Sequence, residues 1–370
     1  MSQNDPTFID LFAGAGGLSI GLARAGFRLI AATDWDHWSC ETLRANHRGI
    51  PILEGDILDI DLEEFSKSLD TQTIDLIVGG PPCQGFSQLG KQDAADPRNQ
   101  LWREYMRFVK YFKPKMFLME NVPQLLTSDE YRQIYDVAKK LGYNIQAKVL
   151  HAVDFGVPQK RKRAIILGSK IGTPEHPEPS YTSPEQYNLF NGNLKPWRTV
   201  RDAFKDLPLK PNSKNWHVGR NPTPTSLKRY KTIPPGGNRF DLPPELTPDC
   251  WKRKKTGSTD VFGRLEWDKP SLTIRTEFFK PEKGRSLHPS EHRPITIREA
   301  ARLQTFPDNY KFVGSNTQVA KQIGNAVPCD LAFGIGLKLF QTLNAPTKTQ
   351  HNKVVNRHSS LKRQSAKLLA

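Results

Sequence analysis

The sequence contains few cysteines, and their spacing argues against a metal site or a disulfide framework. The chain of 370 residues holds only Cys40, Cys83, Cys250 and Cys329, which form no C-x-x-C pair and accompany no histidine cluster at metal-ligand spacing. Structural zinc sites and disulfide scaffolds normally show such clusters. We therefore expect no metal cofactor.

Long apolar runs are also missing. No stretch approaches the roughly 18 to 20 residues that span a bilayer, and the N-terminus MSQNDPTFID lacks the basic, apolar pattern of a signal peptide. We therefore expect a cytoplasmic protein that does not bind a membrane.

Acidic residues are in deficit. The sequence has 38 Asp and Glu against 54 Lys and Arg, which gives a formal net charge of +16. A field of this sign attracts polyanions, so nucleic acid is the favoured partner. Residues 344–370 contain no acid and show little periodicity, which predicts a basic, disordered tail.

The first half of the chain alternates short β-rich runs with helical patterns. TFIDLFA precedes LSIGLARAGF, FRLIAAT precedes HWSCETLRANH, and IDLIVG precedes LWREYMRFVKYF. This alternation predicts a doubly wound α/β domain, with a mostly parallel sheet covered on both faces. Ligands in this architecture bind beyond the carboxyl ends of the strands, where we expect the functional residues.

The composition changes after about residue 172. Residues 179–295 are rich in Pro, Lys and Arg, and regular periodicity returns only at TIREAARLQ. A disordered insertion would lack the large aromatic residues found here, among them Trp197, Trp216, Trp251 and Trp267. We therefore predict a smaller, irregular, β-rich domain at 179–295, and a main domain formed by 1–178 and 296–343.

A glycine-rich turn follows the first predicted strand. DLFAGAGGLSIG places Gly14, Gly16 and Gly17 between a strand and a helix. Glycine lets the backbone turn sharply and approach a ligand, and a helix N-terminus favours a negative group. The same pattern also suits an ordinary tight strand–helix turn, so it is a weak signal alone.

Acids at the next two strand ends add to this signal. Asp34 can bind ribose hydroxyls, and Trp35 beside it can stack on an adenine ring. Asp56 and Ile57, in GDILDI, suit the adenine amine and one face of the ring. These residues predict an adenosine cofactor, without choosing between NAD and S-adenosylmethionine.

Cys83 has an unusual setting in IVGGPPCQGFSQLG. A lone cysteine is more often a buried small hydrophobe than a nucleophile. Here Pro81 and Pro82 fix φ and delay any helix, so Cys83 is presented from a strand end toward the cofactor crevice.

Charged residues follow at further strand ends. Glu120 ends KMFLME, where a buried strand would prefer an apolar residue, and it could alternatively cap the next helix. Arg161 and Arg163, in QKRKR, occupy alternate positions and so share one face of a strand, although they could simply be solvated. Their joint occurrence with Cys83 favours a catalytic site.

Taken together, these motifs resemble those of DNA (cytosine-5) methyltransferases, of the compact type found in bacterial restriction-modification systems. FAGAGG, GGPPCQGFS, ENV, QKRKR, REAARLQTFPD and QIGNAVP occur in the order and spacing of that family. The resemblance covers residues 8–340, except for about 180–290. Many members carry Glu where this chain has Asp34, so a carboxylate is retained.

The resemblance implies a catalytic role for each of four residues. Cys83 would add to C6 of a flipped-out cytosine, which makes C5 nucleophilic. Glu120 would bind the N3 and amine edge, Arg163 would hold O2, and Arg161 would point toward a backbone phosphate. Arg161 and Arg163 are also candidates for lowering the pKa of Cys83.

The resemblance further implies a Rossmann-like domain that binds S-adenosyl-L-methionine, and a target-recognition domain at 179–295. The expected cofactor contacts are Phe12, Gly14, Ala15, Gly16, Gly17, Asp34, Trp35, Asp56, Ile57, Pro82, Leu101, Asn325 and Val327. The expected DNA contacts are Ser87, Gln88, Lys91, Arg98, Lys252, Arg253, Lys254 and Lys255.

Double-stranded DNA is the expected partner of a monomeric enzyme, and a cognate restriction endonuclease acting on the same site is a possible second one. Two alternatives remain. A tRNA methyltransferase family shares these motifs, but its Cys-Phe-Thr signature is missing here, where Cys250 lies in PDCWKRK. A catalytically silent DNA-binding protein would be expected to lose Cys83 or Glu120, and both are present.

Overall fold

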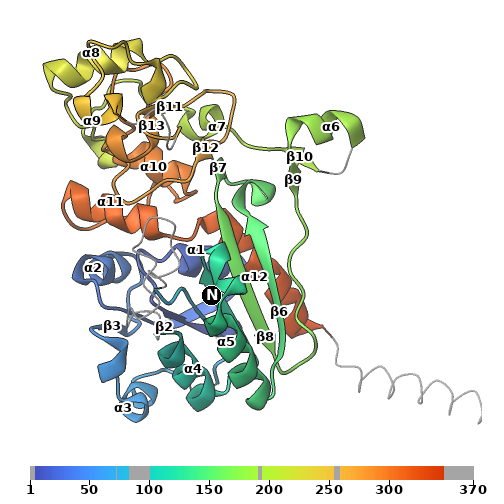
Figure 1. Cartoon of the computed structure of the whole chain (residues 1–370). Helices are drawn as coiled ribbons and strands as arrows, with labels where there is room; N and C mark the ends of the chain where they lie inside the picture. Colours follow the sequence, from blue (N-terminus) through green and yellow to red (C-terminus); the bar gives the residue numbers. More distant parts are fainter. Residues whose placement is uncertain (1–4, 72, 83–100, 191–193, 254–258, 346–370) are drawn as a thin grey trace, which may run out of the picture.

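The computed structural model describes residues 5–71, 73–82, 101–190, 194–253 and 259–345 (Figure 1). Several predicted site residues lie outside these ranges, namely Cys83, Ser87, Gln88, Lys91, Arg98, Lys254 and Lys255. The chain forms a larger part built on one sheet and a smaller part of short elements (Figure 1).

A seven-stranded sheet organises the larger part, in the order β3-β2-β1-β4-β5-β8-β6. Its strands are β1 (Thr7–Leu11), β2 (Arg28–Asp34), β3 (Ile52–Glu54), β4 (Leu76–Gly79), β5 (Met116–Asn121), β6 (Asn144–His151) and β8 (Lys162–Ser169). Neighbours pair in parallel from β3 to β5, while β8 is antiparallel to both β5 and β6. The predicted mostly parallel α/β sheet is confirmed.

Helices cover both faces of this sheet because successive strand residues point to opposite sides. On one face, Ile9 and Ile77 pack with α3 (Leu62–Lys67), α4 (Leu101–Phe112) and α5 (Asp129–Lys140). On the other face, Phe8 and Val78 pack with α1 (Gly17–Arg24) and α12 (Cys329–Asn344). In the sequence, α2 (His37–Asn46) connects β2 to β3.

The expectation that no long apolar segment exists is wrong for the C-terminal helices. The stretch Asn316–Asn344, which contains α11 (Asn316–Asn325) and α12, is long and apolar enough to cross a membrane, but 61% of its apolar window is buried inside the protein. A Cβ on Gly21 of α1 would lie 2.4 Å from the Cβ of Ala332 in α12. The apolar character of α12 therefore serves close packing against α1.

The smaller part contains only short elements. In chain order they are β7 (Gln159–Lys160), β9 (Tyr181–Thr182), α6 (Pro184–Phe190), β10 (Lys195–Pro196), α7 (Val200–Phe204), α8 (Pro224–Thr232), α9 (Asp249–Lys252), β11 (Gly263–Arg264), β12 (Ser271–Leu272), β13 (Arg285–Leu287) and α10 (Ile297–Leu303). Its described strands are two or three residues long, so the β-rich character expected for 179–295 is wrong. Sixteen of the 29 prolines lie in that range, and proline removes the donors that longer ladders need.

Residues 179–295 contribute to two hydrophobic cores. Tyr230, Phe262 and Leu287 belong to a small core formed within that range. Phe204 and Ile274 instead join a second cluster with residues from α1, α10 and α11. One part of the range is therefore continuous with the larger part of the protein.

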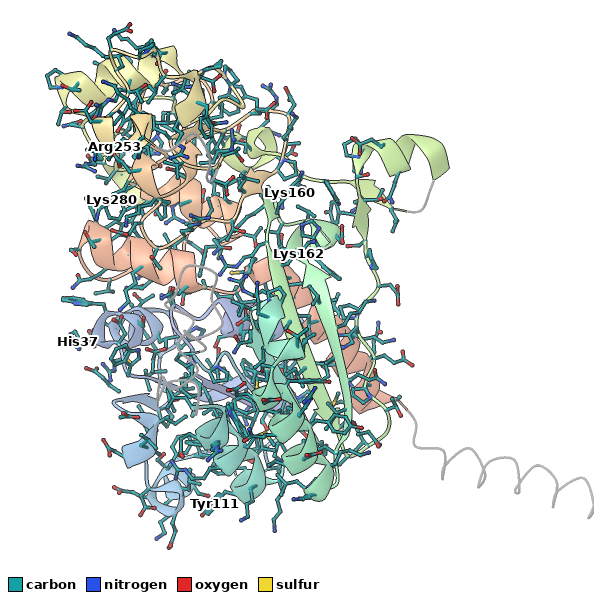
Figure 2. The ribbon with its side chains drawn as sticks, in the orientation of Figure 1. His37, Tyr111, Lys160, Lys162, Arg253 and Lys280 are labelled. Carbon is teal, nitrogen blue, oxygen red and sulfur yellow. The ribbon has the colours of Figure 1, made fainter. Side chains whose placement is uncertain are left out.

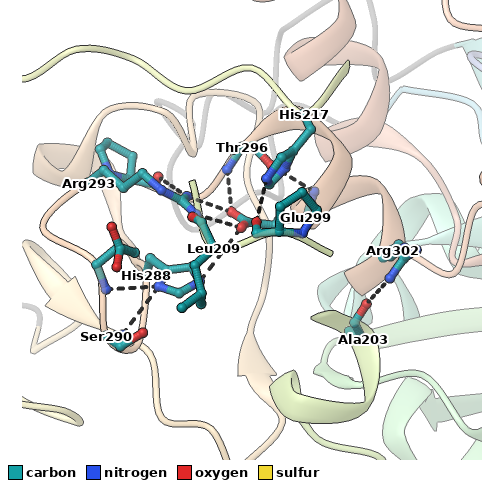
Figure 3. Close-up of polar contacts among 12 residues, drawn as sticks. Ala203, Leu209, His217, His288, Ser290, Arg293, Thr296, Glu299 and Arg302 are labelled. Atoms are coloured by element: carbon teal, nitrogen blue, oxygen red, sulfur yellow. Dashed lines mark hydrogen bonds and ion pairs between the residues drawn. The ribbon is translucent and has the colours of Figure 1, made fainter. Parts of the chain in front are cut away.

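A buried ionic cluster fixes the start of α10 (Figure 3). The guanidinium of Arg293 donates to both carboxylate oxygens of Glu299, at 2.9 and 2.8 Å, and also to the carbonyl of Leu209 at 2.7 Å. Nε2 of His288 lies 3.7 Å from the same carboxylate. Burial alone would raise the pKa of Glu299, but Arg293, His288 and the amide of Thr296 together hold that pKa below its usual value.

Candidate functional site

The loop after β1 leaves room for a ligand at one glycine and none at another. Gly14 and Gly16 have φ of +54° and +76°, in the left-handed region that glycine favours. A Cβ on Gly14 would meet nothing within 4 Å, whereas one on Gly17 would lie 2.1 Å from the carbonyl oxygen of Val327. The loop is therefore open toward Gly14. At Gly17 it is closed by Val327, which belongs to residues 296–344, called the C-terminal segment below.

Asp34, at the end of β2, anchors this loop. Its Oδ2 accepts the amide N–H of Gly14 at 2.7 Å, and its Oδ1 accepts the amide N–H of Asp36 at 2.8 Å. Burial raises the pKa of Asp34, while these backbone hydrogen bonds act in the opposite direction. Each carboxylate oxygen has a second lone pair, so the group can still accept a ligand hydroxyl.

The other predicted cofactor contacts at these strand ends differ in exposure. Trp35 is 72% exposed, and Nζ of Lys321 lies 5.7 Å from its ring centroid. Asp56 accepts the amide N–H of Leu58 at 3.0 Å. The side chain of Ile57 is buried in the core, whereas that of Leu58 is 59% exposed. Leu58, which the sequence analysis did not single out, is thus the more exposed apolar side chain beside Asp56.

The remaining predicted cofactor contacts lie around the loop or pack beneath it. The hydroxyl of Tyr310 donates to the carbonyl of Ala15 at 2.7 Å. Phe12 has φ of +56° and, with Leu101, is partly buried against the core. Asn325 is exposed at the end of α11. The structure therefore brings Tyr310 and Val327 beside the glycine-rich loop.

The turn that leads to Cys83 is held by residues at the end of β5. A Cβ on Gly80 would lie 2.9 Å from Oε2 of Glu120, so the carboxylate packs directly against this turn. Nδ2 of Asn121 donates to the carbonyl of Pro81 at 2.9 Å. Glu120 is 9% exposed. The turn that ends at Pro82, the last described residue before Cys83, therefore lies beside the nearly buried carboxylate of Glu120.

Arg163 provides the counter-charge of Glu120. Its Nε lies 2.7 Å from Oε1 of Glu120, and the two side chains are 16% and 12% exposed. The pairing follows from strand register, because Glu120 of β5 faces Ile165 of β8 across the antiparallel ladder. The structure thus joins two predicted catalytic residues, and Glu120 does not act as a helix cap: the cap of α5 is Ser128.

The structure places Arg161 in the protein interior. It is 2% exposed and donates to the carbonyls of Ile274 and Gly324 at 3.2 and 3.1 Å. Burial is the main cause that lowers its pKa, and the charge of Arg163 acts in the same direction. In this arrangement its guanidinium faces interior carbonyls and does not point to a surface where a phosphate could bind.

The described candidates for DNA contact lie in the smaller part. Lys252 of α9 is exposed and lies 3.0 Å from Oδ1 of Asp249, and Arg253 follows at the end of the same helix (Figure 2). Exposed pairs of this kind are weak, so Lys252 can exchange Asp249 for a phosphate. Within the described ranges, no group of three His, Cys, Asp or Glu side chains could hold a metal ion.

Sequence reasoning missed the two amide side chains that organise the site, Asn121 and Gln159. Both lie in motifs that had been recognised, ENV and QKRKR, but neither carries charge, and their partners are distant in sequence. Nε2 of Gln159 donates to Oε1 of Gln304, 145 positions away, at 2.8 Å. The signal that could have identified Asn121 and Gln159 is their position inside these recognised motifs.

Comparisons with known proteins give the relatives of this chain. A sequence model of the family described as C-5 cytosine-specific DNA methylase matches residues 6–341. The Type II methyltransferase M1.HphI of Haemophilus parahaemolyticus is 36% identical over 340 residues, which cover 89% of this chain and 85% of that protein. The Type II methyltransferase M.PspPI of Psychrobacter sp. is 39% identical over 350 residues, covering 92% and 80%.

Solved structures share the fold. A prophage-encoded protein from E. coli, assigned as a DNA modification methyltransferase, is 27% identical, with a TM-score of 0.68 over 92% of this chain and 99% of that one. The Dnmt2 methyltransferase of S. pombe has a TM-score of 0.65 over the same shares at 20% identity, which shows likeness of fold alone.

Proposed function

Because the chain belongs to the family of C-5 cytosine-specific DNA methylases, we propose that Cys83, Glu120 and Arg163 carry out its methyl transfer. The protein is a Type II DNA (cytosine-5) methyltransferase that uses S-adenosylmethionine. The observation that carries the assignment of residues is the Glu120–Arg163 pair, 2.7 Å apart, beside the turn that leads into Cys83.

The residues around the glycine-rich loop fit an adenosine cofactor. The space beside Gly14 admits a ligand, Asp34 retains free lone pairs for ribose hydroxyls, and the exposed ring of Trp35 is available for stacking. Asp56 and Leu58 offer a carboxylate and an apolar face at the next strand end. When bound, S-adenosylmethionine supplies an electrophilic methyl group.

Cys83 acts as the nucleophile that activates the base. Its thiolate forms a bond to C6 of cytosine, the electrons of the C5–C6 double bond shift toward N3, and C5 becomes nucleophilic. Once C5 carries the methyl group, loss of its proton restores the double bond and expels the thiolate. Cys83 then returns to its starting state.

Glu120 and Arg163 orient the base and compensate its changing charge. Glu120 binds the N3 and amine edge, where a proton must be held as the thiolate adds. Arg163 binds O2 while its guanidinium keeps the Glu120 carboxylate in place. The low exposure of the pair supports this assignment, because a charge pair shielded from water is firmly oriented.

DNA binds between the catalytic residues and the smaller part. C6 is inaccessible inside a duplex, so the cytosine must flip out of the helix. Residues 179–295 act as the target-recognition domain, in which Lys252 and Arg253 bind backbone phosphate, together with Lys254 and Lys255 outside the described ranges. Residues 84–99, also outside those ranges, supply further contacts beside Cys83.

The protein works as a cytoplasmic monomer associated with DNA, and its methylation protects sites from a cognate endonuclease. The net charge of +16 supports a polyanionic partner. The Type II methyltransferases similar to this chain support a role in restriction-modification.

Bisulfite sequencing of DNA from cells that express the protein tests the activity and reads the target site. Wild-type protein should protect one cytosine in a fixed sequence context, and Cys83→Ser should protect none. Duplex DNA that carries 5-fluorocytosine at that position should form an adduct that survives denaturant. Methylation without such an adduct would refute the covalent role of Cys83.

A further inference from the structure

We propose that the side chains of Gln159 and Arg161 bind the backbone of Ile274, within the 179–295 segment, and that this contact, here called the clasp, holds the segment in register with the catalytic pair. They are positioning residues for methyl transfer, and Arg161 is not a phosphate contact. The proposal rests on the function proposed above and adds to it the link between target recognition and chemistry.

The two side chains bind both polar groups of one residue. Oε1 of Gln159 accepts the amide N–H of Ile274 at 2.9 Å, and Nη1 of Arg161 donates to the carbonyl of Ile274 at 3.2 Å. The backbone beside them is paired too, because β12 runs parallel to β7. The hydroxyl of Thr273 also donates to the carbonyl of Lys160 at 2.9 Å. Residues 271–274 of the 179–295 segment are therefore bound to QKRKR.

The same side chains bind the C-terminal segment. Nη2 of Arg161 donates to the carbonyl of Gly324, and Nε2 of Gln159 donates to Oε1 of Gln304 at 2.8 Å. Gln304 in turn donates to the carbonyls of Ile323 and Ala326, at 2.7 and 3.2 Å. Gln159 of β7 and Arg161, which lies between β7 and β8, thus join three segments that are remote in sequence.

Backbone packing supports this junction independently. A Cβ on Gly324 would lie 2.4 Å from the amide nitrogen of Thr276 and 2.5 Å from the carbonyl carbon of Arg275. These neighbours are backbone atoms and cannot turn away as a side chain could. The last turn of α11, where QIGNAVP begins, therefore packs directly against the backbone of Arg275 and Thr276.

The catalytic pair lies on the same stretch of chain. Gln159, Arg161 and Arg163 occupy alternate positions, and Arg163 binds Glu120 at 2.7 Å. A displacement of Ile274 would therefore act on Arg163 through the clasp. No ion pair to Arg161 occurs in the part of the chain that the structure describes, which suits a group whose task is to bind carbonyls. Lys160 and Lys162, the intervening residues, are exposed (Figure 2).

The test compares Arg161→Met and Arg161→Lys with Lys162→Gln, a matched loss of one positive charge at an exposed neighbour. Loss of the clasp should lower kcat by about 10- to 100-fold, in line with misplacement of catalytic groups by about 1 Å. Arg161→Lys keeps the positive charge, but a lysine ammonium cannot bind the carbonyls of Ile274 and Gly324 simultaneously, as the guanidinium does, so this variant should lose activity as well. Because Arg161 also binds the carbonyl of Gly324, next to the expected cofactor contact Asn325, the affinity for S-adenosylmethionine is measured separately from kcat.

The salt dependence of DNA binding separates the clasp from a phosphate contact. Removing a phosphate contact lowers the slope of log K against log salt by about 0.9, whereas removing the clasp leaves that slope unchanged. Gln159→Leu should reproduce the loss of kcat, and its effect combined with Arg161→Met should be less than multiplicative, because both act on Ile274. Melting curves identify any variant that fails to fold. If Arg161→Met fails to fold, the kcat of Arg161→Lys provides the test of the clasp.

Two failures are distinguishable. If wild-type protein does not methylate DNA, the proposed function falls. If wild-type protein methylates DNA while folded Arg161→Met and Arg161→Lys keep its kcat, or if the salt slope falls by about 0.9 in Arg161→Met, the clasp is refuted and the enzyme assignment stands.

Discussion

Alanine substitutions at Gly14 and Gly17 should separate cofactor binding from folding within one loop. The Cβ of Gly17→Ala would lie 2.1 Å from the carbonyl oxygen of Val327, well inside ordinary van der Waals contact of 3.4 to 4 Å. The two backbones must therefore move apart by more than 1 Å. Overpacking of this kind typically costs about 1 to 3 kcal/mol, and two facing backbones place this site at the upper end.

Gly14→Ala should behave in the opposite way. Its Cβ would meet no protein atom within 4 Å, so packing is unaffected. The left-handed φ of +54° adds about 1 to 2 kcal/mol of strain for a residue with a Cβ. Because the open side of Gly14 is where the cofactor is proposed to bind, affinity for S-adenosylmethionine should fall at least about tenfold, or about 1.4 kcal/mol.

Thermal unfolding and calorimetric titration with S-adenosylmethionine provide the two measurements. Gly142→Ala is the matched control, since Gly142 has φ of +84°, meets nothing within 4 Å, and lies between α5 and β6, away from the loop. It should share the loss of stability of Gly14→Ala and keep wild-type affinity. The reasoning is refuted if Gly14→Ala binds the cofactor as tightly as Gly142→Ala does, or if Gly17→Ala melts at the wild-type temperature.

Three further substitutions test other parts of the structure. Glu120→Gln should lower turnover by about two orders of magnitude or more with little change in melting temperature; an active enzyme in a methyl-transfer assay would contradict the proposed role. Arg293→Met leaves Glu299, which is 1% exposed, without its partner and should cost about 3 to 5 kcal/mol in urea unfolding; adding Glu299→Gln should recover part of that loss. Burial raises the pKa of Asp10 to about 7 despite its hydrogen bond from Ser19. Since that folded pKa lies above the ordinary value, the contribution of Asp10 to stability is greatest at acid pH and is lost as pH rises to about 7. Asp10→Asn should therefore weaken the dependence of the melting temperature on pH over that interval. An unchanged pH dependence would contradict the raised pKa of Asp10.

The sequence analysis predicted the sheet and the strand-end chemistry because both depend on local patterns. Alternating strands and helices indicated a parallel sheet, and Glu120 stood out as an acid at the end of an apolar strand. The antiparallel insertion of β8 between β5 and β6 was not predicted. Periodicity shows which residues face a core, but it does not give the direction or order of strands that are joined through longer connections.

Long-range polar contacts were the least predictable feature. For Arg161 the family resemblance implied a phosphate contact, and the carbonyls of Ile274 and Gly324 that it binds leave no signal in side-chain chemistry. The β-rich expectation for 179–295 failed for a related reason. Aromatic residues indicated an ordered core, and the structure forms that core mainly from short helices and turns around Tyr230 and Phe262.

The closure of the glycine-rich loop by the C-terminal segment also sets when the enzyme becomes active during its synthesis. All seven strands of the sheet have been made once β8 ends at Ser169, yet Val327 and α12 come later, with α12 ending at Asn344. At about 5 to 20 residues per second, the ribosome needs roughly 10 to 35 s more to add them. Until then α1 has no partner helix and the loop at Gly17 lacks the backbone that closes it. A nascent chain therefore exposes apolar sheet surface before it can bind its cofactor, and methylating capacity arrives only with the last helix.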